Sequence, residues 1–149
     1  MKPINTNNTA SEMVRSATSA QLRVAFRELE LYDAGDIAGA DEVFASDFID
    51  HNAAPGTTSH IESMRALITS VRDGFTSTQH RVIFYRELPD GWVLLHWQMT
   101  ATHTGAAFGV PASGKPVDIT GIDIMRIVDG KTTELYHVEE LLKLIQQMS

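Results

Sequence analysis

Cysteine is absent from this chain of 149 residues. Its absence excludes disulfide bonds, thiolate metal sites and a cysteine nucleophile, and it agrees with the cytoplasmic location that we expect. Clustered basic residues are also lacking: 12 Lys and Arg stand against 19 Asp and Glu, which gives a formal net charge of −7. Because phosphate binding needs clustered positive charge, we expect no nucleic-acid partner.

Long apolar runs are missing as well. No stretch is long enough to span a bilayer, and residues 1–10 lack the apolar core of a signal peptide, so we expect no membrane partner. Hydrophobic residues at 43% and charged residues at 21% are ordinary for a globular core and its surface. We predict a frayed polar tail at residues 1–12 and a single domain at residues 13–149.

Several catalytic motifs do not occur. The sequence has no His-Glu-x-x-His, no glycine-rich phosphate loop and no Gly-x-Ser-x-Gly turn. His80, His103 and Asp123 offer the ligand types of a facial metal triad. An imidazole that faces a carboxylate commonly holds no metal, so we expect neither a metal nor another cofactor.

Apolar residues at helical spacing predict three helices in the first half of the chain. The first begins near Ser19 and ends at Gly35, and Asp36 caps a second, short helix. A brief strand or turn at residues 47–50 precedes the third helix, which Ser59 begins and Gly74 ends. A last short helix is predicted at residues 139–148.

The second half of the chain alternates apolar and polar residues and is rich in β-branched and aromatic side chains, which predicts antiparallel strands. Asp90-Gly91 and Asp129-Gly130 are strong signals for tight hairpins between them. The order predicts an α+β fold, in which a curved antiparallel sheet of about four main strands is covered by three N-terminal helices. The predicted strands are residues 79–88, 92–106, 116–128 and 131–138.

Asp123 and His103 each interrupt an otherwise apolar row that the alternation places on the inner face of this sheet. A carboxylate on an apolar wall loses hydration, which raises its pKa toward the range of a general base. We therefore predict Asp123 and His103 as a catalytic pair in a buried pocket. The alternative is a structural pair, in which His103 satisfies a buried Asp123.

Other residues are predicted to contact a small ligand. His51 and Asn52 precede a Pro-Gly turn that can reach the pocket mouth, although turn chemistry alone also explains an Asn there. The remaining candidates lie on predicted inner faces, where core packing is the alternative. The predicted substrate-binding residues are Tyr32, His51, Asn52, His80, Phe84, Trp97, Met99, Met125 and Tyr136.

The opposite face of the predicted sheet carries too many aliphatic side chains for a surface exposed to water. We predict that a homodimer formed sheet to sheet covers them. A single β-bulge would move part of either face to the other side, because side chains alternate with a period of two residues. The aliphatic residues of this face are Ile83, Leu94, Ile122, Ile124 and Leu135.

Several motifs together resemble the SnoaL-like polyketide cyclase (ester cyclase) family, over about residues 20–148. They are Thr-Ala-Thr-His-Thr-Gly at 100–105, Phe-Gly-Val-Pro-Ala-Ser-Gly-Lys at 108–115, Gly-Ile-Asp-Ile-Met-Arg at 121–126, Asp-Gly-Lys at 129–131 and Glu-Leu-Tyr at 134–136. The chain departs from the family pattern at Tyr136, where a Trp is usual, and at Glu140, where an Asp is usual.

The resemblance implies a nuclear transport factor 2-like cone, commonly dimeric, with a pocket inside the curved sheet. It implies an intramolecular aldol ring closure of a polyketide ester without metal or cofactor, with Asp123 and His103 matching the family's acid/base Asp and its assisting His. The pocket asparagine and tyrosine of the family map to Asn52 and Tyr32. Other readings remain open: a ketosteroid-isomerase-like isomerase, an epoxide hydrolase, or a small-ligand-binding dimer without catalysis. In each, the expected partner is a small apolar compound that carries a carbonyl group.

Overall fold

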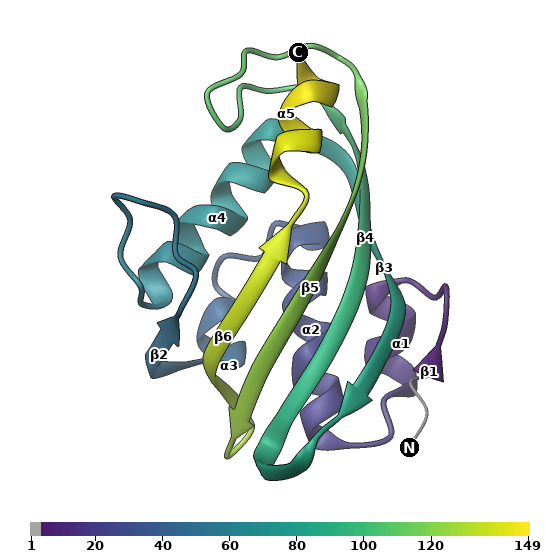
Figure 1. Cartoon of the computed structure of the whole chain (residues 1–149), viewed down its shortest axis with the longest axis vertical. Coiled ribbons are helices and arrows are strands. Elements are labelled where there is room, and N and C mark those ends of the chain that lie inside the picture. The colour runs from purple at the N-terminus through teal and green to yellow at the C-terminus, as the bar shows by residue number, and fades with distance from the viewer. Residues whose placement is uncertain (1–3) are drawn as a thin grey trace.

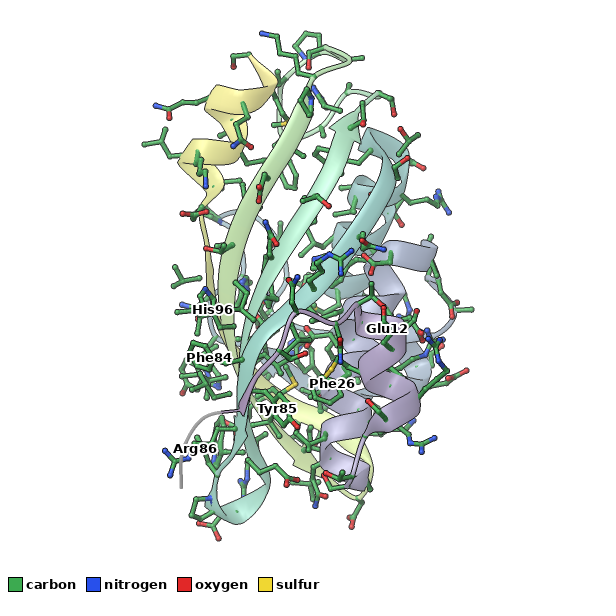
Figure 2. All side chains as sticks on the ribbon, turned by 90° about the vertical axis from the view of Figure 1, so that its right-hand side faces the viewer. Glu12, Phe26, Phe84, Tyr85, Arg86 and His96 are labelled. Atoms are coloured by element: carbon green, nitrogen blue, oxygen red, sulfur yellow. The ribbon has the colours of Figure 1, made fainter. Side chains whose placement is uncertain are left out.

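Helices and long strands form two layers in the computed structural model, which describes residues 4–149. Figure 2 shows α1 and α2 on one side of the long strands. The elements are β1 (Ile4–Asn5), α1 (Ala10–Ser16), α2 (Ala20–Ala34), α3 (Ala40–Val43), β2 (Phe44–Asp50), α4 (Ile61–Gly74), β3 (Phe75–Glu87), β4 (Trp92–His103), β5 (Pro116–Val128), β6 (Lys131–Glu139) and α5 (Leu141–Met148).

Within residues 4–149 the sheet has six strands, in the order β1-β3-β4-β5-β6-β2 (Figure 1). Strands β3 to β6 form the predicted antiparallel meander. The short strand β2 runs parallel to β6 at one edge, which makes the sheet mixed. The predicted α+β class is confirmed. Helix α1 and strand β1 were not predicted, and the brief strand or turn predicted at residues 47–50 is part of β2.

The N-terminal segment differs from the prediction of a frayed tail at residues 1–12. Within the described part, β1 pairs with β3, and α1 begins at Ala10 after the Thr9 hydroxyl has accepted a hydrogen bond from the Glu12 N–H. The buried side chains of Ala10 and Met13 anchor α1 to the core. The prediction is therefore wrong from residue 4 onward, and residues 1–3 lie outside the described part.

Helix α2 begins and ends at the predicted residues. The Ser19 hydroxyl accepts a hydrogen bond from the Leu22 N–H, which satisfies one of the free donors of the first turn. Gly35 ends the helix in a left-handed conformation with φ of 62°, which glycine adopts without a steric penalty. The helix thereby presents one continuous buried face to the sheet.

The two Asp-Gly hairpins have different loop lengths. Asp129 and Gly130 both have positive φ, 51° and 78°, and form the two-residue turn between Val128 and Lys131. The other hairpin uses the three residues Pro89–Gly91, and the Leu88 N–H donates to the Trp92 carbonyl at 2.8 Å.

Two of the register shifts in the sheet turn residues to the face opposite the predicted one. The pairing of β3 with β4 shifts between Val82 and Phe84. As a result, Phe84 packs against His96 on the side of the sheet away from the helices, while Tyr85 packs against Phe26 of α2 (Figure 2). The predicted inward position of Phe84 is wrong, because an extra residue in the strand reverses the alternation after it.

The second irregularity is a shift in the pairing of β5 with β6, between Arg126 and Ile127 of β5. Beyond it, Leu135 is buried at 2% exposure, whereas Tyr136 and Val138 are 44% and 71% exposed. The predicted inward position of Tyr136 and outward position of Leu135 are both wrong for this reason.

The core lies between the helices and the inner face of the sheet, with fully buried residues such as Phe26, Leu95 and Met125. Ile122 and Ile124 remain on the outer face, 44% and 37% exposed. In the described range 4–149, no helix has the length and hydropathy needed to cross a membrane.

Candidate active site

A cavity of about 540 Å³ lies between the inner face of the sheet and helices α2, α4 and α5. Most of its wall is apolar and comes from residues such as Leu29, Met64 and Ile119. Ionisable and polar groups converge on it from α2, from four strands and from the loop after β2: Glu28, Tyr32, Asp50, Asn52, His80, Asp123, His137 and Glu139. A mostly apolar cavity with a few convergent polar groups is typical of a small-molecule site.

Asp123 lies in the middle of β5, opposite Leu95 of β4 and His137 of β6, and its side chain lines the cavity. Only 5% of the residue is exposed. Burial raises the pKa of Asp123 from 3.8 to about 6, against the lowering effects of the Trp97 indole and the His137 imidazole. Asp123 is therefore ionised at neutral pH but basic enough to accept a proton from carbon.

Trp97 forms the wall beside Asp123, and Gly121 makes room for it. These two residues are cross-strand partners on β4 and β5. A Cβ atom at Gly121 would lie 2.1 Å from Cζ2 of Trp97, which is shorter than any tolerated contact. The missing side chain at Gly121 thus lets the indole lie against the strand two residues before Asp123.

His137 is held between two carboxylates. Its Nε2 lies 3.0 and 3.1 Å from the two carboxylate oxygens of Asp50, and its Nδ1 lies 2.8 Å from Oε2 of Glu139. Burial alone would lower its pKa, but the hydrogen bonds to Asp50 and Glu139 outweigh it and raise the pKa of His137 to about 10. His137 is therefore an imidazolium at neutral pH, directly across from Asp123.

Glu28 is a second buried carboxyl group at the cavity. It comes from the face of α2 that also carries Ala25 and Tyr32, and only 2% of it is exposed. Burial, reinforced by the negative charge of Asp123, raises the pKa of Glu28 well above its usual value. The phenol of Tyr32, one turn further along the helix, also has its pKa raised by burial and by Glu28.

The structure brings a majority of the predicted site residues to the cavity. His80 is fixed by Asp33, whose carboxylate accepts hydrogen bonds from the His80 N–H and lies 2.6 Å from its Nδ1. The His80 ring packs between Tyr32 and Trp97. The predicted residues that line the cavity are Tyr32, Asn52, His80, Trp97, Met99 and Asp123.

His103 does not face Asp123, so their predicted pairing is wrong. The partner of Asp123 on β4 is Leu95, and His103 lies eight residues further along that strand. This separation corresponds to roughly 26 Å at about 3.3 Å per residue. His103 is instead fully buried against Phe75, with Nδ1 at 2.8 Å from the Ser113 hydroxyl. The facial metal triad considered from the sequence is consequently not assembled either.

Four further predicted residues lie outside the cavity wall. Met125 is fully buried in the core, and Phe84 packs on the outer face against His96. His51 forms an exposed pair with Glu134 at 3.1 Å, and its ring stacks on Tyr136 at 4.2 Å between centroids. Predictions that these four residues, Phe84, His51, Met125 and Tyr136, contact a ligand are therefore not supported by their positions.

Glu28, Asp50, His137 and Glu139 belong to the site but were not predicted. A register inferred from simple alternation turns His137 and Glu139 outward, and only the irregularity in β6 brings them in. Glu28 did leave a signal in the sequence: it is a charged residue on the helical stripe of Ala25 and Tyr32, which spacing of three and four residues places on one face.

Comparison with known proteins shows the same fold and gives the family. Residues 22–148 match the model of the SnoaL-like polyketide cyclase family. Aklanonic acid methyl ester cyclase DnrD from Streptomyces peucetius is 26% identical over 119 residues, which cover 76% of this chain and 79% of that protein.

Solved structures add support for the fold alone, since their sequence identities are low. TsrD from Streptomyces laurentii aligns with a TM-score of 0.79 at 23% identity and covers 89% of this chain and 96% of its own. IdmH from Streptomyces antibioticus, a candidate polyketide cyclase, gives 0.73 at 21% identity and covers 85% and 96%. With a family match over nearly the whole domain, the chain belongs to the SnoaL-like polyketide cyclase family.

Proposed function

We propose that this protein is a cofactor-independent cyclase that closes a ring in a polyketide ester by aldol chemistry, with Asp123 as the general base. The observation that carries the proposal is the Asp123 carboxylate, buried on the wall of a mostly apolar cavity with a pKa of about 6. A general base works best when its pKa lies near the working pH. DnrD, a relative, is named for the cyclisation of such an ester, aklanonic acid methyl ester.

The reaction conserves all atoms of the substrate. Asp123 removes a proton from the carbon between two carbonyl groups, and the enolate carbon attacks a ketone carbonyl of the same molecule. A C–C bond forms, the C=O π bond breaks, and the oxygen becomes an alkoxide. Asp123 then returns its proton to that alkoxide, so the product is a cyclic alcohol isomeric with the substrate. The cavity contributes by folding the chain and by excluding water.

The neighbouring groups have supporting roles in this proposal. The imidazolium of His137, fixed by Asp50 and Glu139, keeps a positive charge across from Asp123 and limits the rise of its pKa. Asn52 holds the loop after β2 to β6, because its Oδ1 accepts a hydrogen bond from the His137 N–H at 2.9 Å. Tyr32, His80, Trp97 and Met99 would contact the substrate.

The test is ring closure of aklanonic acid methyl ester in D2O by the wild type and by Asp123→Asn. The wild type should convert the ester to an isomeric, ring-closed product resolved by chromatography, in which the acidic carbon carries a new C–C bond in place of the proton that Asp123 removes. Loss of the base should lower the rate by about 10²–10⁴-fold. Asp118→Asn, an exposed carboxylate on the same strand, is the matched control and should keep the wild-type rate. Equal rates for Asp123→Asn and the wild type would overturn the proposal.

The same experiment separates the competing functions. An isomerase that moves a double bond would return a proton to another carbon instead of closing a ring, so in D2O it would give an open-chain isomer that carries deuterium. An epoxide hydrolase would neither close a ring in this ester nor isomerise it, because the ester carries no epoxide. A protein that only binds ligands would retain the ester unchanged, with or without Asp123.

A further inference from the structure

The second carboxyl group of the cavity, Glu28, has no role in the steps described above. Its Oε2 is completely buried and has no hydrogen-bond partner among residues 4–149. A buried carboxylate without partners is strongly disfavoured, because it loses its hydration and gains nothing in return. A neutral carboxylic acid at the same place has an O–H group that can be offered to a ligand.

The surroundings of Glu28 favour the neutral form from several elements. Asp123 on β5 and Asp50 on β2 are negative groups that raise its pKa, and burial does so more strongly. His137 on β6 acts in the opposite direction, but its charge is already bound by Asp50 and Glu139. Tyr32 on α2 and His80 on β3 line the same cavity, and the His80 ring forms its hydrogen bond with Asp33.

The two carboxyl groups, Glu28 and Asp123, thus line one cavity from opposite layers, the helix and the sheet. Their environments separate their roles. Asp123 lies across from the imidazolium of His137 on the neighbouring strand, whereas Glu28 has an oxygen without a hydrogen-bond partner among the described residues. Two carboxyl groups kept in different protonation states are typical of sites in which one accepts a proton and the other donates a hydrogen bond.

We propose that Glu28 is a neutral hydrogen-bond donor for a carbonyl oxygen of the ligand, placed across the cavity from Asp123. This inference rests on the proposed function for its role in turnover. There, Glu28 would donate to the ketone oxygen on which negative charge develops during ring closure, and it would keep its own proton. Asp123 alone takes and returns the transferred proton. The ligand class follows as a compound with a carbonyl group that reaches α2 while its acidic carbon reaches β5.

The protonation of Glu28 can be measured without any substrate. Infrared spectra at pH 8 should show the carbonyl stretch of a protonated, buried carboxyl group in the wild type. The band should disappear in Glu28→Gln and persist in Asp123→Asn, the matched control from the same cavity. Absence of the band in the wild type, or its persistence in Glu28→Gln, would overturn the inference.

Donation to a carbonyl can be measured with a pair of neutral probes, 1-tetralone and tetralin, which share a bicyclic skeleton but differ in the ketone. Glu28→Met, which cannot donate, should weaken 1-tetralone binding by about 3- to 10-fold and leave tetralin within about 2-fold. Glu28→Gln, whose amide can donate, should bind both probes nearly as the wild type does. An equal loss for both probes in Glu28→Met would show a merely structural role.

The outcome of these measurements on Glu28 does not depend on whether Asp123 is the base. If Asp123→Asn retained ring closure, the base would be wrong, yet the infrared band and the probe pair would still report on Glu28. If neither probe bound to the wild type, the infrared result alone would decide the inference. If the band were absent while Asp123→Asn was inactive, Glu28 would be excluded and the proposed base would stand.

Discussion

His137, which is partly buried, and His103, which is fully buried, lie on long strands of the same sheet but in different electrostatic surroundings. His137 is enclosed by the carboxylates of Asp50 and Glu139 and lies across from Asp123. His103 contacts the neutral Ser113 hydroxyl and the ring of Phe75, and its Nε2 has no hydrogen-bond partner in the described chain. His137 therefore belongs to a network of charged groups, whereas His103 has neutral neighbours.

The difference shows that strand register, rather than residue type, decides which imidazole can influence Asp123. The ionisable groups of the cavity come from α2, β2, β3, β5 and β6, and the end of β4 at His103 contributes none. The chemistry that we propose is therefore confined to one part of the sheet. The predictions below test this separation, from the largest expected effect on stability to the smallest.

Replacing His137 should have the largest effect. His137→Gln leaves Asp50, which is only 5% exposed, without its charged partner, and the loss of one member of a buried ion pair costs about 3 kcal/mol. Because the pKa of His137 rises from 6.5 to about 10 on folding, its stabilisation is complete below pH 6.5 and disappears as the pH rises through about 10. Urea unfolding across this range should show the slope in the wild type and not in the variant.

His51→Gln is the matched control for that experiment. His51 also pairs with a carboxylate, Glu134, but both side chains are 31% exposed, and such surface pairs contribute at most about 1 kcal/mol. An equal loss of unfolding free energy in the two variants would contradict the larger contribution that we assign to the ion pairs of His137.

Asp123→Asn should stabilise the protein at neutral pH while it removes activity. The pKa of Asp123 rises from 3.8 to about 6 on folding, so the ionised native state carries a cost that grows from pH 3.8 and is complete above about pH 6. The variant should gain roughly 2–3 kcal/mol relative to the wild type between pH 3.8 and pH 8. A pH-independent difference, measured by urea unfolding, would contradict the raised pKa.

Ser113→Ala should lower stability by about 1 kcal/mol, because it removes one partly buried hydrogen bond to His103. It should leave the pH dependence of the ring-closure rate unchanged, since His103 lies far from Asp123 along β4. A shift in the pH profile of ring closure would show that His103 influences Asp123 and would contradict their separation.

The outer face of the sheet should respond least in stability. We propose that this face, which includes Ile122 and Val138, is the surface of a homodimer, because an apolar patch on a monomer is usually covered. Ile122→Lys and Val138→Lys should change the free energy of monomer unfolding by no more than about 0.5 kcal/mol. Analytical ultracentrifugation should find a dimer for the wild type and monomers for the variants; a monomeric wild type would contradict the proposal.

The sequence predicted the elements well because their signals are local. Ser19 and Gly35 mark the ends of α2, and Asp129-Gly130 marks a hairpin, through the conformations that these residues prefer. Asp123 and Trp97 could be placed on the inner face because β4 and β5 alternate without interruption. On these two strands Asp123, Trp97 and Met99 line the cavity as predicted, whereas Met125 and His103 are buried on the same face without reaching it.

The remaining site residues depend on information that is not local. The irregularities in β3 and β6 reverse the faces of Phe84, Tyr136 and His137, and nothing in the composition of those strands marks the extra residue. His103 was paired with Asp123 because both interrupt apolar rows, but the distance between them follows from the pairing of Leu95 with Asp123. Register across the whole sheet had to be known before chemistry could be assigned.

Titration of Asp123 is the most direct measurement of the central claim. Carbon-13 chemical shifts of its labelled carboxyl group should report a pKa of about 6 in the wild type, with Asp118 on the same strand as the exposed reference. A carboxyl group of Asp123 that titrates near 3.8 would contradict the account, because an ordinary surface acid is too weak a base for the proposed reaction.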